Sequence, residues 1–412
     1  MLNQQLLRLI SLIALVFTLG GVVAAQSSRP RRVKPAPKPA EDPLLRPEPR
    51  TTTTARTDPN APLIKVQPVQ PVANPIASGD TANAYQLLQQ KQFAAAAKEA
   101  KAVAANFPND AEAWKIAGFA ELNLKQYTEA ASDLEKAVAL QRAAKQEDPN
   151  TVDALAQAYV LSEKFEPALP LLVNATSRAG AKPDVAMLYY RGLAEYKTGK
   201  VEAAERTFNA VLKLNPRDTL SLFYLAQIAL GRNDLDGAIV ALNRATVNDA
   251  RMASAWTLLT SVYLRRAAAA TDTTKADADY LNAVRAGEGL IKVRTDAEAV
   301  TLFGQALIGA QQYARAAAAL ERAAQGDAPG VTFYLLGVAQ SRAKNFPKAI
   351  AALETAATKT PNDVNVYREL GYAYEVSKQY GKALGAYQKG ANLAPGDGDF
   401  KESIERVRPF AK

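Results

Sequence analysis

The stretch VYRELGYAYEVSKQYGKALGAYQKGANLAPGD, residues 366–397, decides the fold, because its spacing of small and aromatic residues recurs along the chain. Leu370, Gly371 and Tyr374 lie three or four residues apart, so they share one face of a first helix. Pro395 ends the pair of helices, because proline cannot continue a helix. The spacing therefore predicts two short helices joined by a turn.

The second helix of this stretch places Ala383, Tyr387 and Gly390 on one face. Gly371 opposite Ala383 removes side-chain bulk where the two helices cross, which predicts a close approach of their axes. A large residue at Gly371 is expected to cost roughly 1–3 kcal/mol through overpacking. The spacing thus has a packing explanation and needs no catalytic one.

The same pattern occurs 34 residues earlier, in Phe333, Leu336, Gly337, Ala349, Leu353 and Pro361. A more distant copy contains Leu188, Gly192, Ala204, Phe208 and Pro216. A fixed period of this length is the signature of a repeat array. Nine repeats are predicted, starting near residues 77, 111, 149, 185, 219, 253, 297, 330 and 364. From residue 80 onward nothing alternates with the two-residue period of a strand.

This pattern resembles the tetratricopeptide repeat family. The resemblance implies an all-α, right-handed α-solenoid of about nine helix-turn-helix units over residues 81–400. Residues 401–412 are predicted to form a capping helix and tail, and the sequence DFKESIERVRPF at 399–410 supplies the polar face that closes the stack. Fold does not fix function, so the resemblance alone names no activity.

The resemblance also implies a concave groove lined by the first helix of each unit. Its fifth, ninth and twelfth positions then predict a partner-binding groove formed by Lys115, Phe119, Tyr189, Leu193, Tyr196, Phe223, Gln227, Gln305, Tyr334, Arg368 and Tyr372. Tyrosine and phenylalanine offer large contact areas, and glutamine can hydrogen-bond an extended backbone. The alternative is that Tyr189, Phe223 and Tyr334 pack against the neighbouring unit. The paired asparagines with which some family members clamp a terminal carboxylate are missing.

The chain of 412 residues contains no cysteine and no histidine. This excludes thiolate nucleophiles, disulfides, zinc sites built on Cys or His, and a Ser-His-Asp triad. Asp277, Asp279 and Glu288 fall on one predicted helix, where exposed carboxylates are usually just solvated. We therefore expect no enzyme activity, no cofactor and no metal.

Net charge argues against nucleic acid as a partner. The chain carries a formal charge of +9, but residues 81–412 contain 40 basic and 36 acidic side chains and are nearly balanced. A nucleic-acid-binding domain usually concentrates its basic residues in a patch or stripe. We expect protein or peptide partners instead.

Residues 1–25 have the pattern of a signal peptide, with Arg8, an apolar run over 9–19, and small residues ahead of Gln26. The alternative is an uncleaved anchor in the inner membrane. Residues 26–80 hold roughly half of the chain's 23 prolines and predict a disordered, Pro-rich linker. Residues 1–80 could contact the membrane or the cell wall. The predicted location is the periplasm, or outside the cell.

Together these features predict a scaffold or adaptor of the bacterial-type cell envelope that holds protein segments in its groove. Two alternatives remain. One is a periplasmic chaperone or carrier for exported client proteins. The other is a protein that binds cell-wall polymer through its basic Pro-rich arm.

Overall fold

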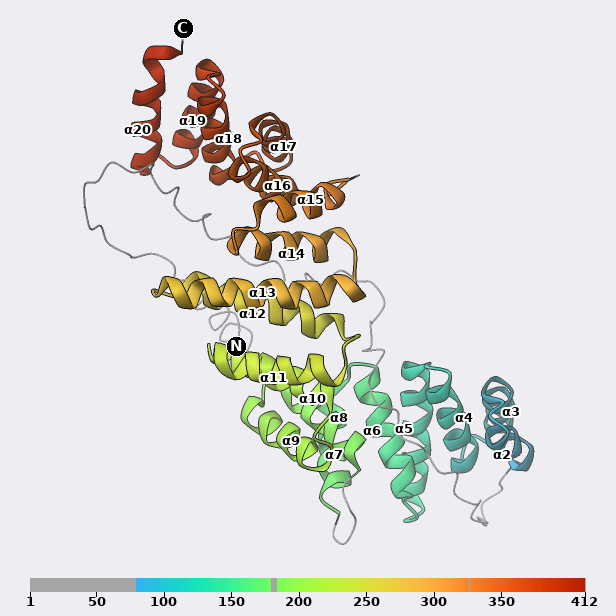
Figure 1. Ribbon diagram of the computed structural model, residues 1–412. Coiled ribbons are helices and arrows are strands. Elements are labelled where there is room, and N and C mark those ends of the chain that lie inside the picture. The colour runs from blue at the N-terminus through green and yellow to red at the C-terminus, as the bar shows by residue number, and fades with distance from the viewer. Residues whose placement is uncertain (1–78, 179–183, 326, 412) are drawn as a thin grey trace. The chain divides into compact units, whose positions relative to one another are not determined.

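The computed structural model describes residues 79–178, 184–325 and 327–411, and within these ranges the chain is helical without strands (Figure 1). The helices are α2 (Ala82–Gln89), α3 (Phe93–Asn106), α4 (Ala111–Asn123), α5 (Tyr127–Ala143), α6 (Pro149–Leu161), α7 (Phe165–Thr176), α8 (Val185–Lys197), α9 (Val201–Leu214), α10 (Thr219–Gly231), α11 (Leu235–Asn248), α12 (Ala253–Ala269), α13 (Thr273–Val293), α14 (Ala297–Gly309), α15 (Tyr313–Ala323), α16 (Gly330–Arg342), α17 (Phe346–Lys359), α18 (Val364–Val376), α19 (Tyr380–Leu393) and α20 (Gly398–Val407), followed by the 3₁₀ helix η1 (Arg408–Phe410).

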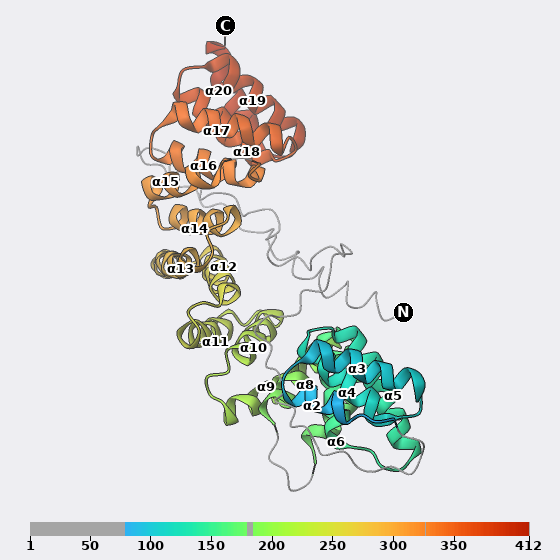
Figure 2. The same ribbon diagram turned by 90° about the vertical axis from the view of Figure 1, so that its right-hand side faces the viewer.

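Consecutive helices pair into hairpins, from α2 with α3 to α18 with α19 (Figure 2). Eight of the predicted repeat starts coincide with the first residue of a helix, and the first repeat begins at Ala82 instead of near residue 77. The second helix of a hairpin packs on the first helix of the next one, as α5 does on α6 and α17 on α18. The predicted all-α repeat solenoid is thus confirmed for the described residues.

The described chain divides into two compact units. Of the described residues, the first unit comprises 79–178, 184–263 and 285–295, and the second comprises 264–284, 296–325 and 327–411. Each has a core of alanine, leucine and aromatic side chains contributed by both helices of every repeat. The predicted signal peptide, and all of the predicted linker except Gly79 and Asp80, lie outside the described residues.

Aspartates fix where the first helices begin. Asp110, Asp148, Asp184, Asp218, Asp296, Asp363 and Asp397 each stand immediately before a helix and accept hydrogen bonds from backbone N–H groups of its first turn. These N–H groups have no partner within the helix, so an aspartate at the cap typically contributes about 1 kcal/mol. The recurring cap fixes the start of these seven helices in register with the repeat.

Most turns inside the hairpins contain one residue in the left-handed backbone conformation. Eight of the nine hairpins carry one residue with positive φ between their helices, and only Gly199, with φ of +77°, is a glycine. The other seven are Lys91, Lys125, Glu163, Asn233, Gln311, Lys344 and Lys378. A side chain at positive φ is sterically unfavourable, so these turns hold strain that the flanking helices maintain.

Close helix packing explains the recurring glycine of the first helix. A Cβ atom added at Gly371 would lie 2.4 Å from the ring of Tyr387, and one added at Gly118 or Gly337 would meet the side chain of Leu134 or Leu353. Gly371 was predicted to lie opposite Ala383, which is buried, and the nearest atoms to the glycine belong to the ring of Tyr387. At the equivalent Gly118 an added Cβ would also lie 3.3 Å from the carbonyl of Ala130, which corresponds to Ala383.

The aromatic residue near the start of a first helix also closes the turn from the preceding repeat. Trp114 Nε1 donates to the carbonyl of Pro108 at 2.8 Å, and Trp256 Nε1 donates to the carbonyl of Ala250 at 3.0 Å. The hydroxyl of Tyr367 donates in the same way to Pro361, at 2.9 Å. The residue thus packs with its ring and satisfies a carbonyl with its polar atom.

Helix α20 closes the second unit. Gly398 stands one 34-residue period after Val364, so α20 is the first helix of a tenth repeat that lacks its second helix. Phe400 is buried against Gly390 of α19, while Lys401, Glu402 and Glu405 are exposed. None of the helices in the described ranges combines the length and apolar character needed to cross a bilayer.

Candidate functional site

The predicted groove residues differ in accessibility. Five are buried within the chain: Lys115, Phe119, Tyr189, Leu193 and Tyr334. Six are half-buried: Tyr196, Phe223, Gln227, Gln305, Arg368 and Tyr372. Only the half-buried group offers side-chain surface that a partner can touch in the described structure.

The buried members have packing or pairing partners inside the chain. Lys115 Nζ lies 2.7 Å from Glu112 Oε2 and 3.7 Å from Asp148 Oδ2, so its charge is compensated. The ring of Tyr189 lies 5.8 Å from that of Tyr190 and 6.2 Å from that of Phe208 in its own hairpin. It also lies 6.3 Å from the ring of Tyr224 in the next repeat, so the Tyr189 side chain packs against the neighbouring unit.

Tyr334 is also a packing residue. Its side chain is 7% exposed, and burial raises the pKa of its hydroxyl well above the usual range. Glu369, close enough to repel a phenolate charge, raises that pKa further. Tyr334 thus stays neutral under all ordinary conditions and presents no surface for binding.

At the C-terminal end, the two predicted groove residues have partners within the chain, Arg368 at α20 and Tyr372 at α17. Arg368 Nη2 donates to Asp397 Oδ2 at 2.5 Å, and its guanidinium lies 4.6 Å from the ring of Phe400. Tyr372 contacts Phe346 edge to face at 6.4 Å. These side chains hold the last helices together, so a partner would have to compete with intrachain contacts there.

Three accessible aromatic residues lie beside one another on α8 and α10. We define the aromatic shelf as Tyr196, Phe223 and Tyr224, which are all half-buried. The ring of Tyr224 lies 5.4 Å from that of Tyr196 and 5.9 Å from that of Phe223. Gln227 is half-buried one helical turn beyond Phe223 and adds an amide that can donate and accept. The shelf combines apolar contact area with hydrogen-bonding capacity.

A buried aromatic layer supports this shelf from below. Phe208 stacks on Tyr224 with centroids 5.3 Å apart and planes inclined by 5°, and Tyr189 lies 6.3 Å from Tyr224. Aromatic pairs of this kind contribute about 0.5–1.5 kcal/mol beyond their burial. Burial also raises the pKa of Tyr196, so the shelf is uncharged at neutral pH. Its rings are held in fixed positions before any partner arrives.

Sequence reasoning missed Tyr224. The positions chosen for the groove were the fifth, ninth and twelfth, whereas Tyr224 occupies the sixth position of its repeat. A signal was present, because consecutive aromatic pairs, Tyr189-Tyr190 and Phe223-Tyr224, stand at the same two positions of neighbouring repeats. In both pairs the second ring faces the preceding repeat: Tyr190 accepts a hydrogen bond from Gln157, and Tyr224 stacks on Phe208.

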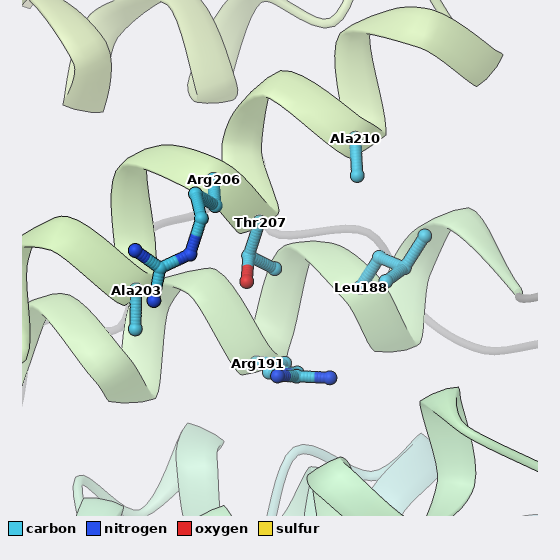
Figure 3. Close-up of a pocket in the computed structure, with 6 residues that line it drawn as sticks. All are labelled: Leu188, Arg191, Ala203, Arg206, Thr207 and Ala210. Atoms are coloured by element: carbon cyan, nitrogen blue, oxygen red, sulfur yellow. The ribbon is translucent and has the colours of Figure 1, made fainter.

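A small hollow lies between α8 and α9, with a volume of about 160 Å³ (Figure 3). Its lining residues are Leu188, Arg191, Ala203, Arg206, Thr207 and Ala210. Arg191 Nε donates to Glu195 Oε1 at 2.8 Å and Thr207 Oγ1 donates to Glu195 Oε2 at 2.6 Å. Because Glu195 already neutralises one arginine, the hollow has little excess positive charge for an anionic ligand.

The predicted exposed carboxylates are only partly exposed. Asp277 is exposed and Glu288 is half-buried, but Asp279 is buried and its carboxylate accepts two hydrogen bonds from Arg266, at 2.8 and 2.5 Å. The expectation of a solvated Asp279 is therefore wrong, because α12 supplies a guanidinium opposite it. Among the described residues no group of three or more acidic side chains is placed to hold a metal ion.

Comparisons with known proteins agree with this architecture. The sequence model of the tetratricopeptide repeat family matches residues 81–149, 154–210, 192–255 and 334–398, more than half of the chain. Superkiller protein 3 of Schizosaccharomyces pombe is 42% identical over 62 residues, which is 15% of this chain. The matched part is 4% of that relative's length.

Similar solved structures share the helical-repeat fold at low identity. The C-terminal part of a TPR repeat-containing protein from Cytophaga hutchinsonii is 13% identical, with a TM-score of 0.47 over 61% of this chain and 99% of that one. YrrB, a TPR protein with an unusual peptide-binding site, is 18% identical, with a TM-score of 0.38 over 48% of this chain and 97% of that one.

Proposed function

Because the chain belongs to the tetratricopeptide repeat family, we propose that it is a non-catalytic scaffold that binds segments of partner proteins. The observation that carries this proposal is the aromatic shelf with Gln227 beside it. Rigid aromatic side chains bind with little loss of side-chain entropy, and an amide can hydrogen-bond the backbone of an extended segment. An extended or loosely folded protein segment is the class of ligand that such a surface suits.

The proposal places this scaffold in the cell envelope. Its support is the N-terminal sequence, where a basic residue, an apolar run and small residues precede Gln26, and where a Pro-rich region follows. In that setting the repeats would stand away from the membrane or wall on the Pro-rich region. Tagged full-length chain, fractionated from its native host, should appear in the envelope or periplasmic fraction; recovery in the cytoplasm would contradict this location.

The binding proposal is tested by replacing the shelf. In the double variant Tyr196→Ser/Phe223→Ser, we expect at least a tenfold loss of affinity for a partner, since buried aromatic anchors commonly cost 2 kcal/mol or more when truncated. The matched control is Val240→Ser/Val247→Ser, which removes two exposed apolar side chains from the second helix α11. Circular dichroism verifies that both variants remain helical.

Affinity capture with the full-length chain identifies the partner before these variants are measured. Recovery of one or two folded proteins in stoichiometric amount, lost in the shelf variant and kept in the control, supports the scaffold. A broad set of unfolded exported proteins points instead to a chaperone. Retention on purified wall polymer that depends on residues 26–80 points to polymer binding. Equal capture by the shelf variant and the control would overturn the assigned site.

A further inference from the structure

A run ahead of the first hairpin has a period of three residues. Residues 66–72 are VQPVQPV, in which valine stands at 66, 69 and 72, glutamine at 67 and 70, and proline at 68 and 71. A polyproline II helix has three residues per turn. In that conformation the run would present one edge of valine, one of proline and one of glutamine.

We propose that this triplet run docks in polyproline II conformation on the aromatic shelf of its own chain. Aromatic-lined surfaces recognise Pro-rich segments because the flat faces of proline rings pack against them, and because little conformational entropy is lost on binding. Tyr196, Phe223 and Tyr224 supply three such rings at consecutive centroid distances of 5.4 and 5.9 Å. Successive prolines of the run are about 9 Å apart, a distance of the same order as the shelf.

The absence of charge makes this run better suited to the aromatic shelf than the rest of the Pro-rich region is. Residues 66–72 carry no charged side chain, whereas the earlier run RPRRVKPAPK at 29–38 is strongly basic. The shelf and Gln227 are uncharged as well and supply no carboxylate to pair with arginine or lysine. Docking the basic run there would desolvate cations without compensation, while valine and proline lose nothing when they leave water.

The length of the connecting chain allows docking within one molecule. The backbone N–H of Gly79 donates to Asp110 Oδ2 at 2.9 Å, which fixes the chain at the start of α4. Residue 69 precedes Gly79 by ten residues, and ten extended residues reach at most about 35 Å. The first helices α4, α6 and α8 pack on one another in sequence, and the rings of Tyr196 on α8 and Tyr224 on α10 are in contact. Three such steps of about 10 Å amount to roughly 30 Å.

Docking within the chain would regulate binding, and this consequence rests on the proposed function. A tethered segment competes at an effective concentration that reaches the millimolar range for short linkers. A partner must therefore displace residues 66–72 before it contacts the shelf. Weak partners would be excluded, and removal of the run would raise the affinity of the remaining ones.

The docking itself is measured without any partner. Because the chain contains no cysteine, the substitutions Gln70→Cys and Lys197→Cys introduce unique sites for nitroxide labels into the full-length protein. Lys197 is exposed and follows Tyr196 directly. Pulsed electron paramagnetic resonance should give a single narrow, short distance population. A broad distribution in this doubly labelled chain would overturn the proposal.

Substitutions on the run test specificity without altering the repeats. Pro68→Ala/Pro71→Ala should broaden the distance distribution, and the matched pair Pro35→Ala/Pro37→Ala should leave it narrow. Phe223→Ser should broaden it as well, with helicity verified by circular dichroism. A tenfold excess of unlabelled chain should change nothing; loss of the short distance on dilution would mean docking onto a second copy and would overturn the assignment within one chain.

Partner binding then separates this proposal from the proposed function. If the run docks as described, Pro68→Ala/Pro71→Ala should bind a shelf-dependent partner several-fold more tightly than the parent chain. A narrow distance population that no captured partner disturbs would leave the docking intact and overturn the partner site. Partner binding lost in the shelf variant, with a broad distribution in the parent chain, would overturn the docking and leave the scaffold intact.

Discussion

At the scale of single residues, replacing a glycine of the repeat has opposite effects on stability, depending on what surrounds that glycine. A Cβ at Gly371 would lie 2.4 Å from the Tyr387 ring, whereas one at Gly385 would meet nothing within 4 Å. We predict that Gly371→Ala destabilises the fold by roughly 1–3 kcal/mol through overpacking. Gly385→Ala, in the exposed interior of α19, should instead stabilise it by about 0.5–1 kcal/mol through helix propensity. Urea unfolding of both variants measures the two signs, and equal signs would contradict this account.

Helical periodicity predicted which residues share a face, and it placed Gly371 and Tyr387 on the facing sides of their helices. It did not predict which side chain lies nearest the glycine, because that depends on the length and direction of side chains. The nearest atoms to Gly371 belong to the ring of Tyr387, which is longer than the methyl group of Ala383.

A buried ion pair gives a second prediction at this scale. Arg342 donates two hydrogen bonds to Glu369, at 3.0 and 2.8 Å, and joins α16 to α18. Their side chains are 15% and 6% exposed. Arg342→Met leaves a buried carboxylate without its cation, so we expect a loss of about 3–5 kcal/mol. The double variant Arg342→Met/Glu369→Met should recover most of that loss, as chemical denaturation can show; a double variant as unstable as the single one would argue against the pairing explanation.

At the scale of elements, the hairpin turns determine how much strain each repeat carries. Gly199, at φ of +77°, has open space around it, whereas Lys125 adopts φ of +62° with a side chain. Gly199→Ala should therefore cost about 1–2 kcal/mol through backbone strain alone. Lys125→Gly should be stabilising by up to about 1 kcal/mol for the same reason. Thermal midpoints of the two variants provide the check, and a stabilised Gly199→Ala would refute it.

The cap helix α20 gives a prediction about acidity. Burial favours the neutral form of Glu375, but hydrogen bonds from Arg406 and Tyr387 outweigh burial and lower its pKa below the ordinary value. A lowered pKa in the folded state means that ionised Glu375 stabilises the fold at neutral pH, and that this contribution is lost as the pH falls through the lowered pKa. Glu375→Gln should therefore reduce stability at pH 7 and flatten its decline between pH 5 and 3.

The matched control for this experiment is Glu405→Gln, on the exposed face of α20. Stability measured by urea unfolding at several pH values should show the difference between variant and parent shrinking toward acid for Glu375 only. Other carboxylates titrate equally in both chains, so they cancel in that difference. A constant difference across the pH range would mean that Glu375 acts through packing and not through its charge.

Element boundaries were predictable because they depend on local chemistry. Six of the nine repeats begin after an aspartate that satisfies N–H groups of its own first helix. The repeats that begin at α2, α12 and α16 follow Thr81, Met252 and Pro329 instead. The period alone predicted the starts of α12 and α16 correctly, and only the start of the first repeat was misplaced.

At the scale of the whole molecule, the accessible binding surface is smaller than the repeat pattern suggests. Position within the repeat selected eleven side chains, and five of them are buried, because residues of neighbouring helices cover them. Lys115 is covered through ion pairing and Tyr189 through aromatic packing. Whether a groove side chain is exposed depends on the residues of the next repeat. Those residues are distant in the sequence, so the pattern within one repeat does not predict the exposure.

The binding prediction at this scale therefore concerns only the shelf. Tyr196→Ser/Phe223→Ser should weaken partner binding while lowering stability far less than Tyr189→Ala, because Tyr189 is fully buried among other rings. Truncating a buried aromatic side chain typically costs 3–5 kcal/mol. Isothermal titration with a captured partner and thermal denaturation of the same samples would separate the two effects.

The position of α20 also determines how the array could be lengthened. Since α20 starts where a tenth first helix belongs, the surface of α19 that receives Phe400 is the surface on which any further hairpin would have to sit. If residues 364–397 were duplicated ahead of Gly398, the added hairpin would pack on a copy of α19 on one side and on α20 or a copy of α18 on the other. Hairpins can thus be gained or lost in multiples of one 34-residue period, while Phe400 of α20 keeps the same packing surface on the hairpin before it.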